Sequence, residues 1–289
     1  MDELFPRDEP ESEPKGERKR VWGLALALMA FLAAMAVLYY FFIAKRPKPA
    51  EIVEAAETKI PAEAAEPAPS TPALEPLAFP AVSLAESDPV VRQFAAAIDA
   101  DPAFSKWILT KDLIRKFVVS VDNVANGTSP KGHLDFFSLE GAFRVTRTRT
   151  GTFLDPASYA RYAPVVGAVR SLDAKAAVRL YRAVEPLLQE AYNELGYPGV
   201  DFDETLVGAM SELLAVPVVT GPIGLSQKVL SYAMTDERLE ELSPAQKQLL
   251  RMGPQGVEAV QAKIREIAAV MGIPASRLPQ ARGLTPAVR

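Results

Sequence analysis

The sequence predicts a mostly α-helical protein, in which a single transmembrane helix precedes a helical soluble domain with one small β-hairpin. An unbroken apolar run over 21–43 predicts the transmembrane helix. Apolar residues recur at helical spacing over much of 86–274, and one segment rich in Thr surrounds a glycine there. The expected organisation is therefore a short cytoplasmic tail (1–20), the transmembrane helix (21–43), a disordered linker (44–85), a helical globular domain (86–274) and a flexible C-terminal tail (275–289).

The apolar run reads VWGLALALMAFLAAMAVLYYFFI and contains no charged residue and no proline. As a helix it would be about 34 Å long, which is enough to cross a hydrocarbon core of about 30 Å. Trp22 and the aromatic residues 39–42 suit the two headgroup regions. A cleaved signal peptide has a shorter apolar core and small residues at its cleavage site, so we expect an uncleaved single-pass helix.

Two features bear on the orientation of this helix. Basic residues flank it on both sides, with Arg18, Lys19 and Arg20 before it and Lys45 and Arg46 after it, so the positive-inside rule gives only a small preference for a cytoplasmic N-terminus. The linker is dominated by Ala, Pro and Glu, cannot form a core, and could extend to about 120 Å as polyproline II. Such a spacer is useful across a periplasm. We therefore expect a protein of the bacterial inner membrane with a periplasmic C-terminal domain.

The first half of the domain shows clear boundaries of its elements. Ser87-Asp88-Pro89 is typical of a helix start, and a second helix is expected over 111–125, ending at Asn126-Gly127. The segment 143–154 predicts a hairpin around Gly151. Asp155-Pro156 then opens another helix.

The second half begins with the longest helix, over 172–195, which has an apolar stripe and is closed by Gly196. Pro186 lies inside it and predicts a kink or a split. A helix over 203–215, a short strand within 228–233, a helix that starts at Ser243-Pro244 and a last helix with Val257 on its apolar face complete the domain.

Four segments resemble the uncharacterised bacterial family listed as domain of unknown function 3014. They read RKFVVSVDNV (115–124), LDPASYARY (154–162), PLLQEAYNELGYP (186–198) and LSPAQKQLLRMGP (242–254). The resemblance implies a membrane-anchored bacterial protein with a helical extracytoplasmic domain, and it implies no activity. The polar loop 126–130 departs from the more basic segment expected there.

No cofactor, metal site or catalytic residue is predicted. The chain has no cysteine and a single histidine, His133, and it lacks a Gly-x-Ser-x-Gly elbow and a phosphate-binding loop. Asp201, Asp203 and Glu204 fit the first turn of a helix better than a calcium loop. Sequence alone leaves open a pair of carboxylates brought together by the fold.

Asp122 is the best single acid for such a pair, because it flanks the apolar face of its helix and would be half-buried. A structural salt bridge or capping bond is the competing interpretation. Arg144, Arg147 and Arg149 lie in the hairpin. Arg147 and Arg149 would share one face of a strand, where they could bind an anionic partner. They could equally keep an edge strand soluble.

The remaining candidates for binding are polar residues expected at helix surfaces: Gln189, Glu190, Gln246, Lys247 and Arg251. Two tyrosine pairs, Tyr159/Tyr162 and Tyr181/Tyr192, have helical spacing and are more typical of a core than of a sugar-binding platform.

Two functions follow from these observations. The first is a non-enzymatic adaptor whose periplasmic domain binds another envelope protein, and the second is an enzyme or binder that acts on envelope polysaccharide or lipid. A nucleic-acid partner is not expected, given a net charge of −4. An apolar groove without converging acids would favour the adaptor, and a pocket with two carboxylates would favour the enzyme.

Overall fold

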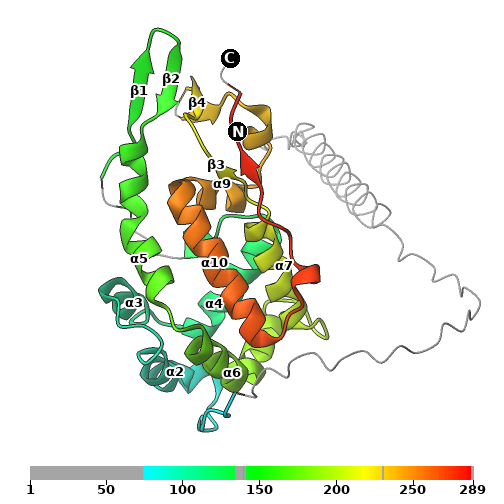
Figure 1. Cartoon of the computed structure of the whole chain (residues 1–289). Helices are drawn as coiled ribbons and strands as arrows, with labels where there is room; N and C mark the ends of the chain where they lie inside the picture. Colours follow the sequence, from blue (N-terminus) through cyan, green and yellow to red (C-terminus); the bar gives the residue numbers. More distant parts are fainter. Residues whose placement is uncertain (1–73, 134–138, 140, 230, 288–289) are drawn as a thin grey trace, which may run out of the picture. The chain divides into compact units, whose positions relative to one another are not determined.

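The computed structural model describes residues 74–133, 139, 141–229 and 231–287 (Figure 1). These residues belong to a compact unit, Pro67–Arg289. The predicted tail and transmembrane helix, and the predicted linker as far as residue 73, lie outside the described residues. Among the helices that are described, none combines the length and the apolarity needed to cross a bilayer. The domain is mostly helical with a small antiparallel sheet, which confirms that part of the predicted fold.

The α-helices of the described residues are α2 (Ser87–Ala95), α3 (Pro102–Trp107), α4 (Leu113–Ala125), α5 (Ala163–Ser171), α6 (Ala174–Glu194), α7 (Phe202–Leu214), α8 (Glu237–Glu240), α9 (Pro244–Leu250) and α10 (Gly253–Met271). Short 3-10 helices are η1 (Leu84–Glu86), η2 (Pro130–His133), η3 (Pro156–Tyr162) and η4 (Ala275–Arg277). The strands are β1 (Val145–Thr148), β2 (Gly151–Leu154), β3 (Val218–Val219), β4 (Gly224–Gln227), β5 (Tyr232–Met234) and β6 (Gly283–Leu284).

The larger of two apolar cores is built by helices α2, α4, α6 and α7. Helix α4 shows why: Ile114, Val118 and Val121 recur at helical spacing, are buried, and pack against α6 and α7. The second core lies under the sheet and is formed by Leu154, Val216, Val219, Ile223, Leu225, Leu239, Leu249, Leu250 and Val257. Helix α10 joins the two, because Val257 lies in the second core and Ala268 in the first.

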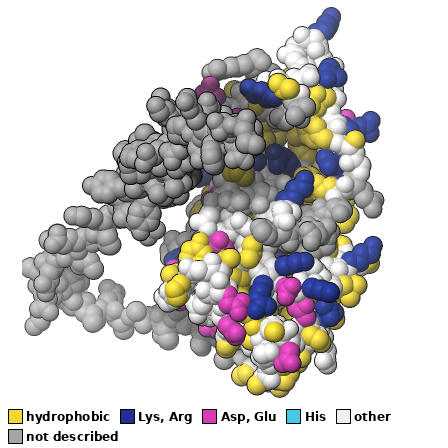
Figure 2. Space-filling model, turned by 180° about the vertical axis from the view of Figure 1, so that it is seen from behind, with side chains coloured by type: hydrophobic (Ala, Val, Ile, Leu, Met, Phe, Trp, Pro, Cys, Tyr) yellow, Lys and Arg dark blue, Asp and Glu magenta, His cyan; other side chains and the backbone are white. Residues whose placement is uncertain are grey.

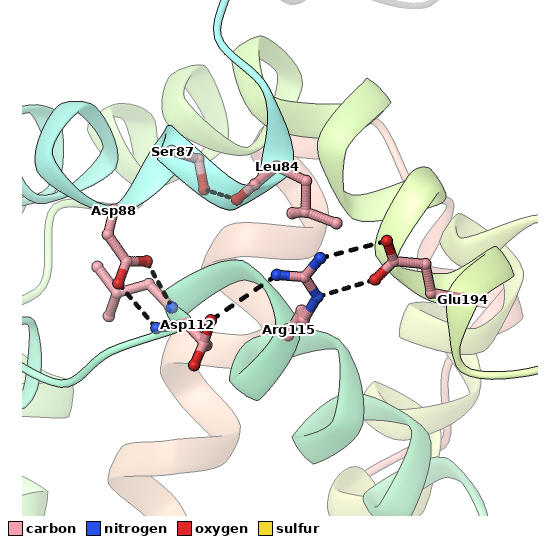
Figure 3. Close-up of polar contacts among 7 residues, drawn as sticks. Leu84, Ser87, Asp88, Asp112, Arg115 and Glu194 are labelled. Atoms are coloured by element: carbon pink, nitrogen blue, oxygen red, sulfur yellow. Dashed lines mark hydrogen bonds and ion pairs between the residues drawn. The ribbon is translucent and has the colours of Figure 1, made fainter.

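The start of α4 is held by a neighbouring helix (Figure 3). Both carboxylate oxygens of Asp88, in α2, accept hydrogen bonds from backbone N–H groups, those of Asp112 (2.7 Å) and Leu113 (2.9 Å). Asp112 has a left-handed backbone (φ 57°), and its own side chain makes no capping bond. Arg115 then donates two hydrogen bonds to the carboxylate of Glu194 (2.8 and 3.2 Å), which fastens α4 to α6.

Helix α6 runs through Pro186 without a break, so the predicted split at this proline is wrong. A proline inside a helix removes one backbone hydrogen bond. Here Val184, Leu187 and Leu188, on both sides of it, are buried in the larger core. Their packing keeps the chain helical across the missing bond.

The predicted hairpin is confirmed as β1 and β2, with Val145 opposite Leu154 and Thr148 opposite Gly151. The sheet is larger than predicted: β4 pairs with β2, and β5 pairs with β4, in the antiparallel order β1-β2-β4-β5. The strand predicted within 228–233 lies mostly in the turn that precedes β5. Strand β4 gives little signal in sequence, because Leu225 is its only large apolar residue.

Both ends of the domain extend beyond the predicted limits. Leu77, Phe79 and Val82, which fall in the predicted linker, pack against the larger core. At the other end, the segment predicted as a flexible tail contributes Leu278 to that core and the strand β6, which pairs in parallel with β3. Backbone hydrogen bonds from Val218 N to Arg282 O (2.8 Å) and from Thr220 N to Leu284 O (3.0 Å) hold it there.

Candidate functional site

An apolar cavity of about 220 Å³ lies where α3, α4, α5, α7, α9 and α10 meet. Its walls are formed by Trp107, Val124, Pro130, Lys131, Leu139, Val165, Val169, Leu213, Ala245, Gln248, Leu249, Met252 and Val260. Lys131 and Gln248 are the polar side chains of this set, and none of the described lining residues is a carboxylate. A concave site with apolar walls and a few polar groups is the usual form of a binding pocket, so this cavity is the candidate site.

Two glycines of α10 bring this helix close to its neighbours at the cavity. Gly253, the first residue of α10, has φ +77°, and a Cβ placed there would lie 2.6 Å from the ring of Tyr159. A Cβ on Gly256 would lie 3.3 Å from Cγ2 of Val166 in α5. Only glycine combines this positive φ with so close a ring. The sequence thus sets how closely η3 and α5 approach the start of α10.

Helix α9 forms one wall, and its predicted candidates mainly hold it in place. Gln246 forms a capping box with Ser243 and donates a hydrogen bond to the backbone oxygen of Glu212 in α7 (3.2 Å). Lys247 forms an ion pair with Glu240 (3.2 Å). Arg251 is exposed and donates to Oε1 of Gln248 (3.4 Å), which itself lines the cavity.

Asp122 is half-buried, as predicted, but it does not face the cavity. Its carboxylate accepts hydrogen bonds from Nδ2 of Asn126 (3.1 Å) and from the hydroxyl of Tyr197. Burial raises the pKa of Asp122, and these two hydrogen bonds act in the opposite direction. Its hydrogen-bond partners are therefore an amide and a phenol, which suits a structural link between α4 and the loop after α6.

Gln189 supports the same loop from the other side. Its amide donates to the backbone oxygen of Val200 (2.8 Å) and accepts from the backbone N–H of Phe202 (3.0 Å), so one side chain ties the loop to α6. Glu190, its neighbour, is exposed to solvent. Asp122 and Gln189 thus meet at the loop between α6 and α7, away from the two arginines and from α9.

The two arginines of the hairpin do not share a strand face. Arg147 lies in β1, is exposed, and donates to the hydroxyl of Tyr232 in β5 (3.3 Å). Arg149 lies in the turn between β1 and β2, because the strand ends at Thr148. The prediction of a common face is wrong, since it extended the period of the strand into the turn.

The tyrosines and the acids near 201 have structural surroundings. Tyr162 and Tyr192 are buried, and the hydroxyl of Tyr181 donates to Asp203. Burial and the charge of Asp203 raise the pKa of Tyr181. Asp201 caps α7 by accepting from the N–H of Asp203 (2.9 Å). Within the described ranges, no three His, Cys, Asp or Glu side chains are placed to hold a metal ion.

The cavity itself was not predicted. Val124, Val165 and Val169 follow helical spacing and are indistinguishable in sequence from ordinary core residues. A cavity forms where side chains from six α-helices fail to fill the space between them, and one sequence gives no signal for that.

Fold and site together define a small helical domain with an apolar cavity and with the predicted polar candidates spread over three separate regions. The chain belongs to the family described as protein of unknown function (DUF3014), whose model matches residues 113–268. All four segments that carry the resemblance lie within this match. No curated protein and no solved structure matches the chain.

Proposed function

We propose that this protein is a non-enzymatic adaptor of the bacterial envelope, anchored in the inner membrane by a single helix. Its N-terminus is cytoplasmic, and its helical domain is periplasmic and binds another envelope protein. The observation that carries the proposal is the apolar cavity bounded by α3, α4, α5, α7, α9 and α10. The anchor rests on the apolar run over 21–43.

The size and chemistry of the cavity indicate what it would accept. An engineered apolar cavity of about 150 Å³ binds benzene, so a cavity of about 220 Å³ has room for one aromatic or branched aliphatic side chain. Protein interfaces draw much of their affinity from such an anchor side chain in a dry pocket. Lys131 adds a positive charge at the wall, which favours a partner with an acidic residue beside its apolar anchor.

An enzyme acting on polysaccharide has less support. Hydrolysis of a glycosidic bond normally uses two carboxyl groups on either side of the substrate. Among the described residues that line the cavity there is no carboxylate, and the hydrogen-bond partners of Asp122 are Asn126 and Tyr197. No observation in the described residues favours this alternative. A nucleic-acid partner is not proposed either, since the sequence pI is about 5.3.

The proposal is tested by photocrosslinking of the full-length protein in living cells. A photoreactive amino acid at Gln248 would lie in the wall of the cavity and should capture one envelope protein reproducibly. The substitution Val169→Phe extends a ring into the cavity and should abolish this capture, because the space for the anchor is then occupied. The melting temperature of the variant should be unchanged or higher, since filling a cavity adds packing.

Two variants serve as controls. Val260→Phe approaches the same cavity from α10 and should have the same effect as Val169→Phe. Val200→Phe makes the same change at an exposed site near α7, 45% exposed, and should leave capture intact. If both cavity variants melt normally and still capture the partner, the cavity is not the binding site. Loss of capture in Val200→Phe alone would place the partner at the loop between α6 and α7 instead.

A further inference from the structure

Two turns of the four-stranded sheet lie at the same end of it. Strands β1 and β2 are joined at Arg149-Thr150, and Thr152 of β2 lies opposite Leu225 of β4. Because β4 runs antiparallel to β2, the chain leaves β4 toward that same end and turns there, with Lys228 N bonded to Ser231 O (2.8 Å). The turn after β1 and the turn after β4 therefore form one surface, which we call the turn end.

The turn end is cationic. It carries Arg147, Arg149 and Lys228, all exposed. The segments 141–154 and 222–234, which contain the strands and both turns, include no aspartate or glutamate. Figure 2 shows Lys and Arg side chains at the tip of the hairpin, at the upper right of that view. Asp155, the first acid after β2, lies 3.9 Å from Arg144, an arginine outside this set.

The turn end also exposes apolar surface. Val229, in the second turn, is 97% exposed and therefore has almost no packing within the domain. Tyr232, the first residue after the second turn, accepts the hydrogen bond from Arg147 through its hydroxyl. Its ring lies 5.9 Å from that of Phe143, which precedes β1 at the opposite end of the hairpin. Exposed cations thus lie beside an exposed apolar side chain at the turn end. That combination is typical of peripheral contact with a membrane, where apolar groups enter the headgroup region and cations meet lipid phosphates.

We propose that the turn end of the sheet docks on a bilayer that contains anionic phospholipid. Its cations are spread over two turns rather than directed at one point, so they suit a charged plane better than a single phosphate. An isolated phosphate or a phosphorylated glycan would use the arginines but would leave Val229 in water. The bilayer accepts both the charge and the apolar side chain.

The absence of cysteine from the chain gives a direct test. In the full-length protein, Thr150→Cys places a unique fluorescent label in the first turn, and Ser105→Cys places the same label on α3 as a reference. The protein is mixed with vesicles of phosphatidylcholine, with or without phosphatidylglycerol, that carry a nitroxide quencher on the lipid. The label at position 150 should be quenched in anionic vesicles only, whereas the label at position 105 should respond little to the anionic lipid.

Charge variants test the cause. The double variant Arg147→Gln/Arg149→Gln should weaken docking by about 25-fold, the product of about fivefold for each arginine. Lys106→Gln/Lys111→Gln removes the same charge near α3 and should leave quenching at position 150 unchanged. Val229→Ser should also reduce the quenching. Combined with the two arginine substitutions, it should reduce the quenching further than those substitutions alone. Salt at high concentration should weaken the docking and so relieve the quenching of the label at position 150.

Three results would overturn the proposal. The first is equal quenching in neutral and anionic vesicles, and the second is quenching that persists in the arginine variant. The third is loss of quenching on addition of millimolar inorganic phosphate at constant ionic strength, which would indicate a site for single phosphates. Flotation of the protein with the vesicles reports separately on the anchor. A protein that floats without quenching at position 150 is anchored but not docked through the sheet.

Discussion

At the scale of single residues, the polar candidates show how one side chain can be important for the fold and still look functional in sequence. Asp122 and Gln189 each sit at a helix surface, and each makes tertiary hydrogen bonds to the loop between α6 and α7. A helical pattern gives the burial of such a residue, because burial follows the period of the helix. The helical pattern does not reveal the hydrogen-bond partners, because Tyr197 and Val200 are brought to Asp122 and Gln189 by the conformation of the loop.

Asp122→Asn should keep the hydrogen bonds from Asn126 and Tyr197, because the amide oxygen can accept them. The free energy of unfolding at neutral pH should change by less than about 1 kcal/mol, whereas Asp122→Ala should lower it by about 1–2 kcal/mol. Burial raises the pKa of Asp122 above 3.8, so the folded state binds this proton more tightly than the unfolded state.

The pH dependence of Asp122 follows from that shift. The free energy of unfolding of the natural protein, relative to that of Asp122→Asn, should rise as the pH falls through the raised pKa. This gain should disappear as the pH rises back through that pKa. Urea titrations of both proteins between pH 3 and pH 7 measure the difference. A constant difference over this range would mean that the carboxyl titrates alike in the folded and unfolded chains.

Gly253 and Gly272 allow a matched comparison of backbone and packing effects. Both have positive φ, but a Cβ would meet the ring of Tyr159 at Gly253 and open space at Gly272. Gly272→Ala should cost about 1–2 kcal/mol for the left-handed backbone alone. Gly253→Ala should lower the free energy of unfolding by this amount and by about 1–3 kcal/mol more, because the added Cβ displaces the ring of Tyr159. Thermal unfolding of the two variants measures the gap, and equal costs would show that Tyr159 moves aside freely.

At the scale of elements, helices were predicted better than strands. The apolar stripe of α6 is visible over its whole length, and the start of α9 follows from its capping residue, Ser243. Helix α7 begins at Phe202, one residue before the predicted start. Strand β4 and strand β6 are short and depend on pairing with distant segments. Their stability comes from backbone hydrogen bonds across the sheet, and sequence pattern does not record that.

Strand β6 gives the prediction that belongs to this scale. The buried carboxylate of Asp236 accepts hydrogen bonds from Arg238 (2.7 Å) and from the backbone N–H of Ala287 (3.0 Å), and these bonds hold its pKa well below the usual value of 3.8. Its contribution to stability is therefore complete above pH 3.8 and is lost as the pH falls below it. Asp236→Asn should lower the free energy of opening of the C-terminal segment by about 2 kcal/mol, because a charged hydrogen-bond acceptor is lost.

Amide hydrogen exchange measures that effect at the strand itself. Exchange at Val218 and Thr220, whose N–H groups bond to the C-terminal segment, should accelerate in Asp236→Asn, while exchange in α6 stays the same. Arg277→Gln, which removes an exposed ion pair with Glu204, is a control and should leave these two amides protected. Unchanged exchange in Asp236→Asn would mean that backbone pairing alone holds β6.

At the scale of the whole molecule, helix α10 is the element that unites the domain. It reaches from the core under the sheet to the core between α4, α6 and α7, and its first half lines the cavity with Val260. The sequence indicates that the domain is helical and roughly where it lies. It could not indicate two cores or the space between them, because both depend on how the helices cross.

The proposed topology leads to a prediction for the intact chain. Alkaline phosphatase fused after Arg289 should be active in cells, since the enzyme needs the oxidising periplasm to form its disulfides. β-Galactosidase fused at the same position should be inactive. The reverse pattern would place the domain in the cytoplasm, and it would remove the membrane surface of the periplasmic leaflet as the target of the turn end.

The pairing of β6 with β3 also sets an order of events during biosynthesis. Residues 283–284 are made well after Val218-Val219, so the N–H groups of Val218 and Thr220 lack these partners until residues 282–284 have emerged. A ribosome or an export channel that still encloses residues 282–284 keeps this small sheet from forming. Folding of the domain is therefore completed only after these residues have emerged, and a chain that stops before residue 282 would leave the N–H groups of Val218 and Thr220 without these hydrogen-bond partners.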